Sequence, residues 1–203
     1  MESDQHYAQR QVRQFKTDTL SQIVASGPAN SKLLVSRVRR DTPGHGLATP
    51  TRSDSVFSIL VQLRKQERRK LFLNDRLVHQ GAFPERTVSV VNHWQSPKAN
   101  LLSAFDTIIF TVPQTALDEV AYEQALRPVP TLLCENEGRL DGTIWSLAQS
   151  LLPALERPEE VGSMYAERVL LASTTYFAQA FGGLRQAAAS RHGLSRRQGQ
   201  SSL

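Results

Sequence analysis

Apolar and polar residues alternate through the middle of the chain, and the period changes to that of a helix in its second half. The clearest alternation runs from Ser55 to Arg64 and predicts a β-strand. Asn74 and Asp75 form a turn pair between two short apolar runs, which predicts a hairpin. The other predicted strands are 87–94 and 105–112. Short, closely spaced strands joined by turn residues favour an antiparallel sandwich or barrel.

Helices are expected over residues 114–181. Pro113 stands where a helix can begin, and Asp141 is a good N-cap for the next one. Apolar residues then recur at intervals of three and four from Ile144 to Leu155, although Pro153 should bend or end that helix. A longer helix is predicted after Pro158 and should run to about residue 180. Strands followed by helices indicate an α+β fold.

The remaining segments suggest three parts of the chain. Residues 1–26 have sparse apolar positions at roughly helical spacing, and the Gly-Pro pair at 27–28 should stop a helix there. Residues 31–36 could form a strand, and the breaker-rich segment that follows is a loop. The predicted organisation is a helical segment over 1–29, a main domain over 30–183 whose helices span 114–181, and a basic flexible tail over 184–203.

Charge is distributed unevenly along the 203 residues. No acidic residue follows Glu167, and five later arginines account for the formal net charge of +5. They are Arg168, Arg185, Arg191, Arg196 and Arg197. The pI near 9.7 therefore reflects the tail, which is more typical of a solvated linker than of a DNA-binding surface.

Composition points to a soluble, cytoplasmic protein with no membrane partner. Apolar residues make up 40% of the chain, enough for a core. The most hydrophobic stretches, near 55–63 and 143–155, are too short to span a membrane, and the polar N-terminus is no signal peptide. A single cysteine, Cys134, excludes an internal disulfide framework.

The sequence offers no catalytic or metal-binding constellation. A metal site in a β-barrel of this kind would need two histidines one residue apart, but His79 and His93 lie on separate predicted strands. No Gly-x-Ser-x-Gly turn occurs, and Cys134 has no histidine near it in sequence. We therefore expect no catalytic residue, no metal ligand and no cofactor.

A small-molecule pocket remains as the candidate site, because such pockets are mostly apolar with a few polar groups. Alternation leaves open which face of each strand looks inward. On 87–94 the two sets are Val88, Val90, Asn92 and Trp94, or Thr87, Ser89, Val91 and His93. On 55–64 they are Phe57, Ile59, Val61 and Leu63, or Ser58, Leu60, Gln62 and Arg64. The candidate ligand-binding residues are Gln62, Arg64, His79, His93 and Trp94, with a role in the core as the alternative for Trp94.

Several segments in this order resemble the N-terminal half of AraC-type transcriptional regulators. They are VFSILVQLR (56–64), LNDRLVHQG (73–81), LLSAFDTIIFTVP (101–113), LLPALERP (151–158) and FAQAFGG (177–183). The resemblance covers roughly residues 30–185. It implies a cupin-like antiparallel β-barrel followed by C-terminal α-helices, which senses a small effector or mediates dimerisation. In that family, a short segment leads from this half into the DNA-binding half, a pair of helix-turn-helix motifs. HGLSRRQ (192–198) stands where that segment would start, and too little chain follows it for a helix-turn-helix. We therefore expect no counterpart of the DNA-binding half in this chain.

The resemblance implies a non-catalytic effector-sensing and dimerisation domain that controls an attached DNA-binding domain. The expected partners are an unidentified small molecule and a second copy of the chain, with DNA reached only through the missing domain. The helix at 159–181 and the stripe at 143–155 are the expected dimer surface. Its candidate residues are Trp145, Leu152, Tyr165, Val169 and Tyr176. The alternatives are a stand-alone cupin-fold enzyme, or a naturally shortened regulator that pairs with a full-length relative.

Overall fold

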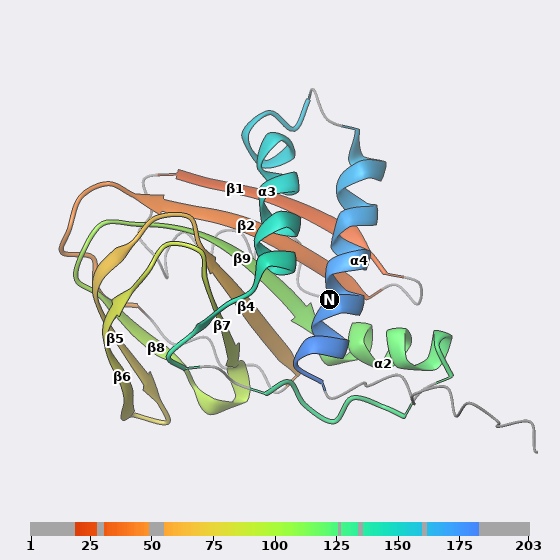
Figure 1. Cartoon of the computed structure of the whole chain (residues 1–203), viewed down its shortest axis with the longest axis horizontal. Coiled ribbons are helices and arrows are strands. Elements are labelled where there is room, and N and C mark those ends of the chain that lie inside the picture. The colour runs from red at the N-terminus through yellow and green to blue at the C-terminus, as the bar shows by residue number, and fades with distance from the viewer. Residues whose placement is uncertain are drawn as a thin grey trace, which may run out of the picture.

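The computed structural model describes residues 19–27, 31–48, 55–125, 127–133, 136–159 and 162–182. Within these residues, antiparallel strands form two sheets that enclose a common interior, and α-helices cover the outer face of the larger sheet (Figure 1). The prediction of an α+β fold, with a cupin-like antiparallel barrel followed by C-terminal helices, is confirmed.

The larger sheet has six strands in the order β1-β2-β9-β4-β7-β10. Its strands are β1 (Thr19–Ser26), β2 (Lys32–Arg40), β4 (Val56–Gln62), β7 (Thr87–Asn92), β9 (Phe105–Pro113) and β10 (Arg139–Leu140). The central strand β9 is buried along almost its whole length, because one of its faces packs against the helices and the other faces the smaller sheet.

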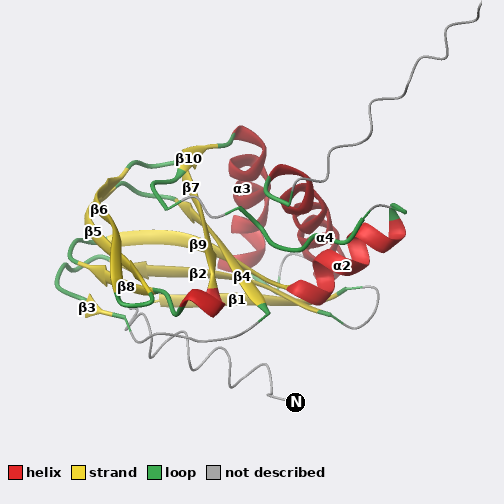
Figure 2. Cartoon of the chain, turned by 90° about the horizontal axis from the view of Figure 1, so that it is seen from below, coloured by secondary structure: helices red, strands yellow, loops and turns green. Residues whose placement is uncertain are grey.

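The smaller sheet has four strands in the order β3-β8-β5-β6. These are β3 (Gly46–Leu47), β5 (Gln66–Leu73), β6 (Arg76–Phe83) and β8 (Lys98–Leu101). The predicted hairpin joins β5 to β6, and both Asn74 and Asp75 have positive φ, as the tightest hairpin turns require. Figure 2 shows this sheet at the opposite end of the molecule from the helices.

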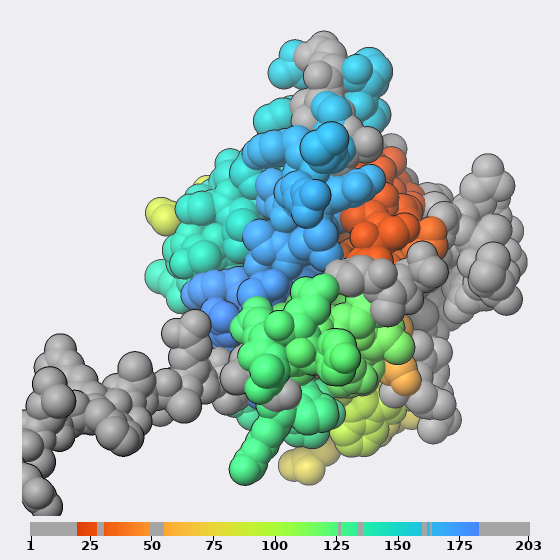
Figure 3. Space-filling view, turned by 90° about the vertical axis from the view of Figure 1, so that its right-hand side faces the viewer, coloured from red at the N-terminus to blue at the C-terminus, as the bar shows by residue number. Residues whose placement is uncertain are grey.

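Three α-helices come after β9 in the described part of the chain: α2 (Gln114–Glu123), α3 (Gly142–Glu156) and α4 (Ser163–Ala180). Asp141 caps α3 as predicted, since its carboxylate accepts hydrogen bonds from the backbone N–H groups of Thr143 and Ile144 at 3.1 and 3.0 Å. Figure 3 shows α4 between α3 and β1, with α2 below it.

The main apolar core lies between the larger sheet and this helical layer. Residues such as Val35, Ile59 and Phe110 face outward from the sheet into it. Phe110 meets Phe177 of α4 edge to face, with ring centroids 5.2 Å apart. The helices are therefore part of the folded body. Two smaller apolar clusters, one around Phe105 and Ile109 and one around Leu71 and Val91, lie between the two sheets.

Two predictions about the elements are wrong. Residues 19–26 form strand β1 and not a helix, because every residue of β1 pairs with β2, from Lys32 to Arg39. The body therefore begins before residue 30; residues 1–18 lie outside the described residues. The strand at 87–94 ends at Asn92, where a 3₁₀ turn, η1 (His93–Gln95), begins. Pro153 lies within α3, which ends three residues later at Glu156; a proline removes only one i→i−4 hydrogen bond, so the last turn still forms.

Candidate ligand site between the two sheets

The face of the larger sheet that looks toward the smaller sheet is unusually polar. Since side chains alternate along a strand, the residues between the outward apolar ones point inward. Buried serine and threonine side chains recur there on four neighbouring strands: Ser36, Ser58, Thr87, Ser89, Thr107 and Thr111. For two strands the sequence left open which face looks inward. On 55–64 the inward set is the one with Ser58 and Gln62, and on 87–94 it is the one with Thr87 and Ser89.

A narrow cavity lies between the sheets at one end of this face. Its walls are mostly apolar. Its polar lining residues are Gln62 and Thr107 from the larger sheet and Gln66 and Arg69 from the smaller sheet. The cavity has about 20 Å³ of free space, which is room for a single water molecule. The apolar lining residues are Val38, Leu60, Ala99, Leu101, Phe105 and Ile109.

Arg69 is the most unusual residue of the cavity. Its side chain is only 3% exposed, and its guanidinium makes no ion pair with any residue that the structure describes. The Nε–H group is buried without a hydrogen-bond partner. Burial lowers the pKa of Arg69 to about 10, so the group is still charged at neutral pH. Within the described residues, the one contact that offsets the buried charge is a cation–π contact with Phe83, whose ring centroid lies 4.5 Å from Cζ.

A β-bulge brings Arg69 and Gln66 to the same side of β5. The pairing of β5 with β6 shifts between these two residues, so Glu67 and Arg68 are both exposed and the alternation restarts at Arg69. Without the shift, alternation from Gln66 would have directed Arg68 inward. Gln66 is also buried, and its Nε2 donor has no partner.

Gln62 lies opposite these two residues on β4. Its Oε1 accepts a hydrogen bond from the Thr107 hydroxyl at 3.0 Å, which fixes the amide in the cavity wall. The cavity thus presents unpaired donors and a positive charge, and no carboxylate lines it. Such a site is electrostatically complementary to an acceptor or an anion.

His79, on β6, lies at the edge of the same polar cluster. Its ring packs edge to face on Phe83 with centroids 4.6 Å apart, so Phe83 separates it from Arg69. Burial first, and then the positive charge of Arg69, lowers the pKa of His79 below its usual value, while Glu137 acts in the opposite direction. The folded protein therefore favours neutral His79.

This shift predicts a pH dependence of stability. As the pH falls below about 6.5, the unfolded chain binds a proton at residue 79 before the folded chain does. The contribution of neutral His79 to the free energy of unfolding is therefore complete above that pH. It is lost as the pH falls toward the lower pKa of the folded state. The melting temperature of His79→Gln should therefore fall less than that of the wild type between about pH 7 and pH 5. Identical pH profiles of the two proteins in scanning calorimetry would contradict this role.

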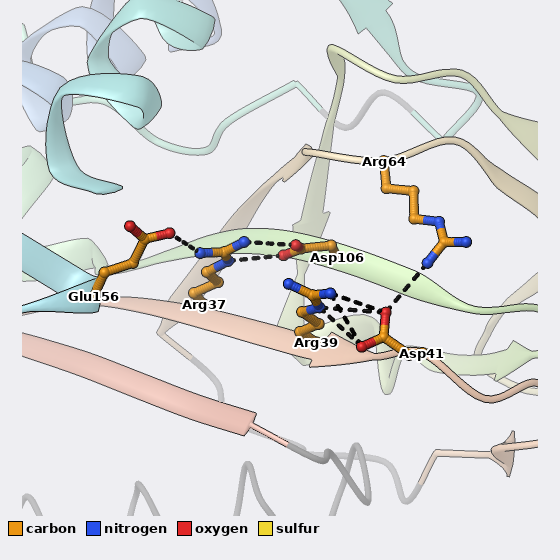
Figure 4. Close-up of polar contacts among 6 residues, drawn as sticks. All are labelled: Arg37, Arg39, Asp41, Arg64, Asp106 and Glu156. Atoms are coloured by element: carbon orange, nitrogen blue, oxygen red, sulfur yellow. Dashed lines mark hydrogen bonds and ion pairs between the residues drawn. The ribbon is translucent and has the colours of Figure 1, made fainter. Parts of the chain in front are cut away.

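The other predicted ligand residues lie elsewhere. Arg64 is exposed beyond the end of β4 and pairs with Asp41 at 3.3 Å, so it does not line the cavity (Figure 4). His93 is buried in η1, and its Nε2 shares a 2.7 Å hydrogen bond with the Ser58 hydroxyl. Trp94 is 51% exposed and points into neither the cavity nor the main core. Of the five candidates, only Gln62 is a cavity residue.

A second polar group connects the opposite face of the same strands to the helices. Arg37 makes a bidentate ion pair with Asp106 on β9, at 2.9 and 2.7 Å, and also contacts Glu156 at the end of α3 at 2.5 Å (Figure 4). The hydrogen bonds to Asp106 raise the pKa of Arg37. Because Phe105 and Thr107 flank Asp106 and line the cavity, a shift of β9 would move both the cavity wall and this ion pair.

The predicted dimer residues on α3 and α4 differ in exposure. Tyr165 is 47% exposed, whereas Trp145, Leu152, Val169 and Tyr176 are half-buried against the main core. Trp145 has the guanidinium of Arg86 over its ring at 5.4 Å, and the Tyr176 hydroxyl donates to the Asp141 carboxylate at 3.3 Å. Tyr165 is thus the most accessible of the five.

The described histidine, cysteine and carboxylate side chains do not form a group of three or more that could hold a metal ion. His79 and His93, the two histidines weighed as metal ligands, have the separate contacts given above. These described residues therefore do not fit a metal of the kind that cupin enzymes use. Cys134 lies outside the described residues. None of the helices in the described ranges is long and apolar enough to cross a membrane.

No family model matches the chain, and no curated protein is significantly similar to it. Solved structures are similar in fold. The AraC-like transcriptional activator CuxR aligns over 91% of this chain and 68% of its own, with 11% identity and a TM-score of 0.46. The cupin domain of Schizosaccharomyces pombe Cnp3 aligns over 55% and 75%, with 10% identity and a TM-score of 0.36. KdgF from Halomonas sp. aligns over 46% and 78%, with 16% identity and a TM-score of 0.34.

These alignments give no role to any residue here. Sequence reasoning missed Arg69 and Gln66, because the segment Gln-Glu-Arg-Arg-Lys looks like a solvated charged face. One signal was available: side chains alternate along a strand, so some residues of this charged segment had to point between the sheets.

Proposed function

We propose that this chain is a non-catalytic receptor domain that binds a small molecule between its two sheets and biases a DNA-binding domain joined to it, as in AraC-type regulators. One observation carries the proposal: buried serine, threonine and glutamine side chains, some of them with unpaired donors, lie beside the apolar clusters between the two sheets, where a purely structural barrel needs apolar packing alone. The resemblance in segment order supports the regulatory part.

The mechanism is a shift between two arrangements of the domain. A ligand favours whichever arrangement it binds better, and its differential affinity limits the size of the shift. The free space in the present arrangement is about 20 Å³, so a ligand larger than water requires the sheets or their side chains to move apart. Movement of β9 would reach α3 through the contact of Arg37 with Asp106 and Glu156.

A thermal-shift screen tests the receptor part. A ligand that binds only the folded chain raises the melting temperature by mass action, by an amount equivalent to about 2.7 kcal/mol at a hundredfold excess over Kd. The screen should contain small acids, their neutral amides, lactones and sugars. A rise that requires Gln62, tested with Gln62→Leu, supports the proposal. The absence of any response to these compounds and to the effector of the intact regulator would contradict it.

Dimerisation through α3 and α4 is the second part of the proposal. Sedimentation equilibrium at roughly 50 µM should detect a dimer, and Tyr165→Glu should weaken it by about tenfold or more, because a charge would enter the centre of the interface. Tyr122→Glu on α2 is the matched control, since Tyr122 is also exposed and should leave the dimer unchanged. A wild-type monomer at this concentration would contradict the dimer.

A further inference from the structure

Resting on the proposed receptor function, we infer that the ligand is a monocarboxylate whose head group is held by Arg69 and Gln66, and whose apolar part displaces the apolar lining of the cavity. The two residues supply the unpaired Nε–H of a guanidinium and the unpaired amide of a glutamine on one strand. A carboxylate has two acceptor oxygens and a single negative charge, which match two donors and one positive charge.

Burial makes this site expensive without an anion. Arg69 is 97% removed from solvent and Gln66 is 98% removed, yet the described residues offer neither of these donors an acceptor. A lone buried charge is strongly unfavourable, and natural proteins pair such groups. A water molecule fits the free space and would accept hydrogen bonds, but it would leave the charge of Arg69 unneutralised.

The walls of the cavity favour a carboxylate over a phosphate. Apart from the hydrogen-bonded pair Gln62 and Thr107, the remaining lining is aliphatic or aromatic, and no second cationic side chain lines the cavity. A phosphate would bring more negative charge than the single guanidinium neutralises. An acid with an aliphatic tail presents one charged end and an apolar body, as this lining does.

Matched acids and amides test the head group on the wild-type protein. Acetate, butyrate and hexanoate should each raise the melting temperature near neutral pH, by about 3 °C at saturating concentration, whereas acetamide, butyramide and hexanamide should not. The amides have nearly the same shape, but they are neutral and carry an NH₂ donor in place of one acceptor oxygen. Sodium chloride at equal ionic strength is the control for screening, and inorganic phosphate should have no effect.

Two variants assign the effect to the residue. Arg69→Gln should weaken binding of hexanoate, measured by calorimetric titration, at least about tenfold, because it removes a charged hydrogen bond. Arg68→Gln carries the same change of charge on the next residue, which is exposed, and should bind as the wild type does. Arg69→Met is a second variant for the same comparison.

The possible outcomes separate this inference from the proposed function. Amides that bind as well as acids, or equal binding by Arg69→Gln, would overturn the carboxylate site and leave a receptor for neutral ligands. A response to phosphate alone would also overturn it. If carboxylates fail but another compound of the screen binds in a way that depends on Gln62, only this inference is wrong. If nothing binds, both are wrong.

Discussion

The Arg69→Met variant is expected to melt at a higher temperature than the wild type in the absence of ligand. Methionine keeps an unbranched apolar side chain in contact with Phe83 and removes the buried charge. Replacing buried charged groups by apolar residues of similar size is often stabilising by about 1–4 kcal/mol. For a chain of this length, about 1 kcal/mol corresponds to a change of roughly 2–4 °C in Tm.

A gain in stability would identify Arg69 as a residue kept for binding and not for folding. Arg68→Met is the control, since Arg68 is exposed and its substitution should change the free energy of unfolding by less than about 0.5 kcal/mol. Calorimetric unfolding of the three proteins decides the question. A marked drop in Tm for Arg69→Met would mean that the guanidinium stabilises the fold, and the argument from its missing partner would not hold.

Phe177→Ala is expected to destabilise the whole domain. Phe177 is completely buried in α4 and its ring meets Phe110 at the centre of the larger sheet, so its loss leaves a cavity between helices and sheet. Substitutions of this kind reduce the free energy of unfolding by about 3–5 kcal/mol. Urea unfolding followed by circular dichroism and by tryptophan fluorescence should show one transition, shifted to lower urea in both signals.

Met164→Ala on the same helix is the matched control, because Met164 is exposed and should change stability by less than about 0.5 kcal/mol. If helical signal were lost in Phe177→Ala while the rest of the unfolding curve stayed in place, the helices would be a separate unit. The proposed route from the cavity to α3 would then lose its physical basis.

The strands and helices were largely predictable from the sequence, because amphipathic spacing, the Asn74-Asp75 turn and the Asp141 cap are local signals. Strand β1 was not. Its apolar residues also fit a helical spacing, and only pairing with β2 along its full length decides for a strand. A contact between distant residues leaves no mark in a short window of sequence.

The candidate site was harder to predict for two physical reasons. Alternation defines two faces of a strand but does not say which one is enclosed, and here both faces are buried, one under helices and one between sheets. In β5 the bulge then shifts the alternation by one residue, so that Arg69 points inward and Arg68 outward. A bulge depends on the partner strands, so the sequence alone could not distinguish between these two arginines.

The most direct test is a crystal structure of the domain with the compound that gives the largest rise in melting temperature. The account predicts that the compound lies between the two sheets, with polar atoms within hydrogen-bond distance of Gln62, Gln66 or Arg69 and with the apolar lining displaced to make room. A ligand bound only on the outer surface or among the helices, with the interior unchanged, would contradict it.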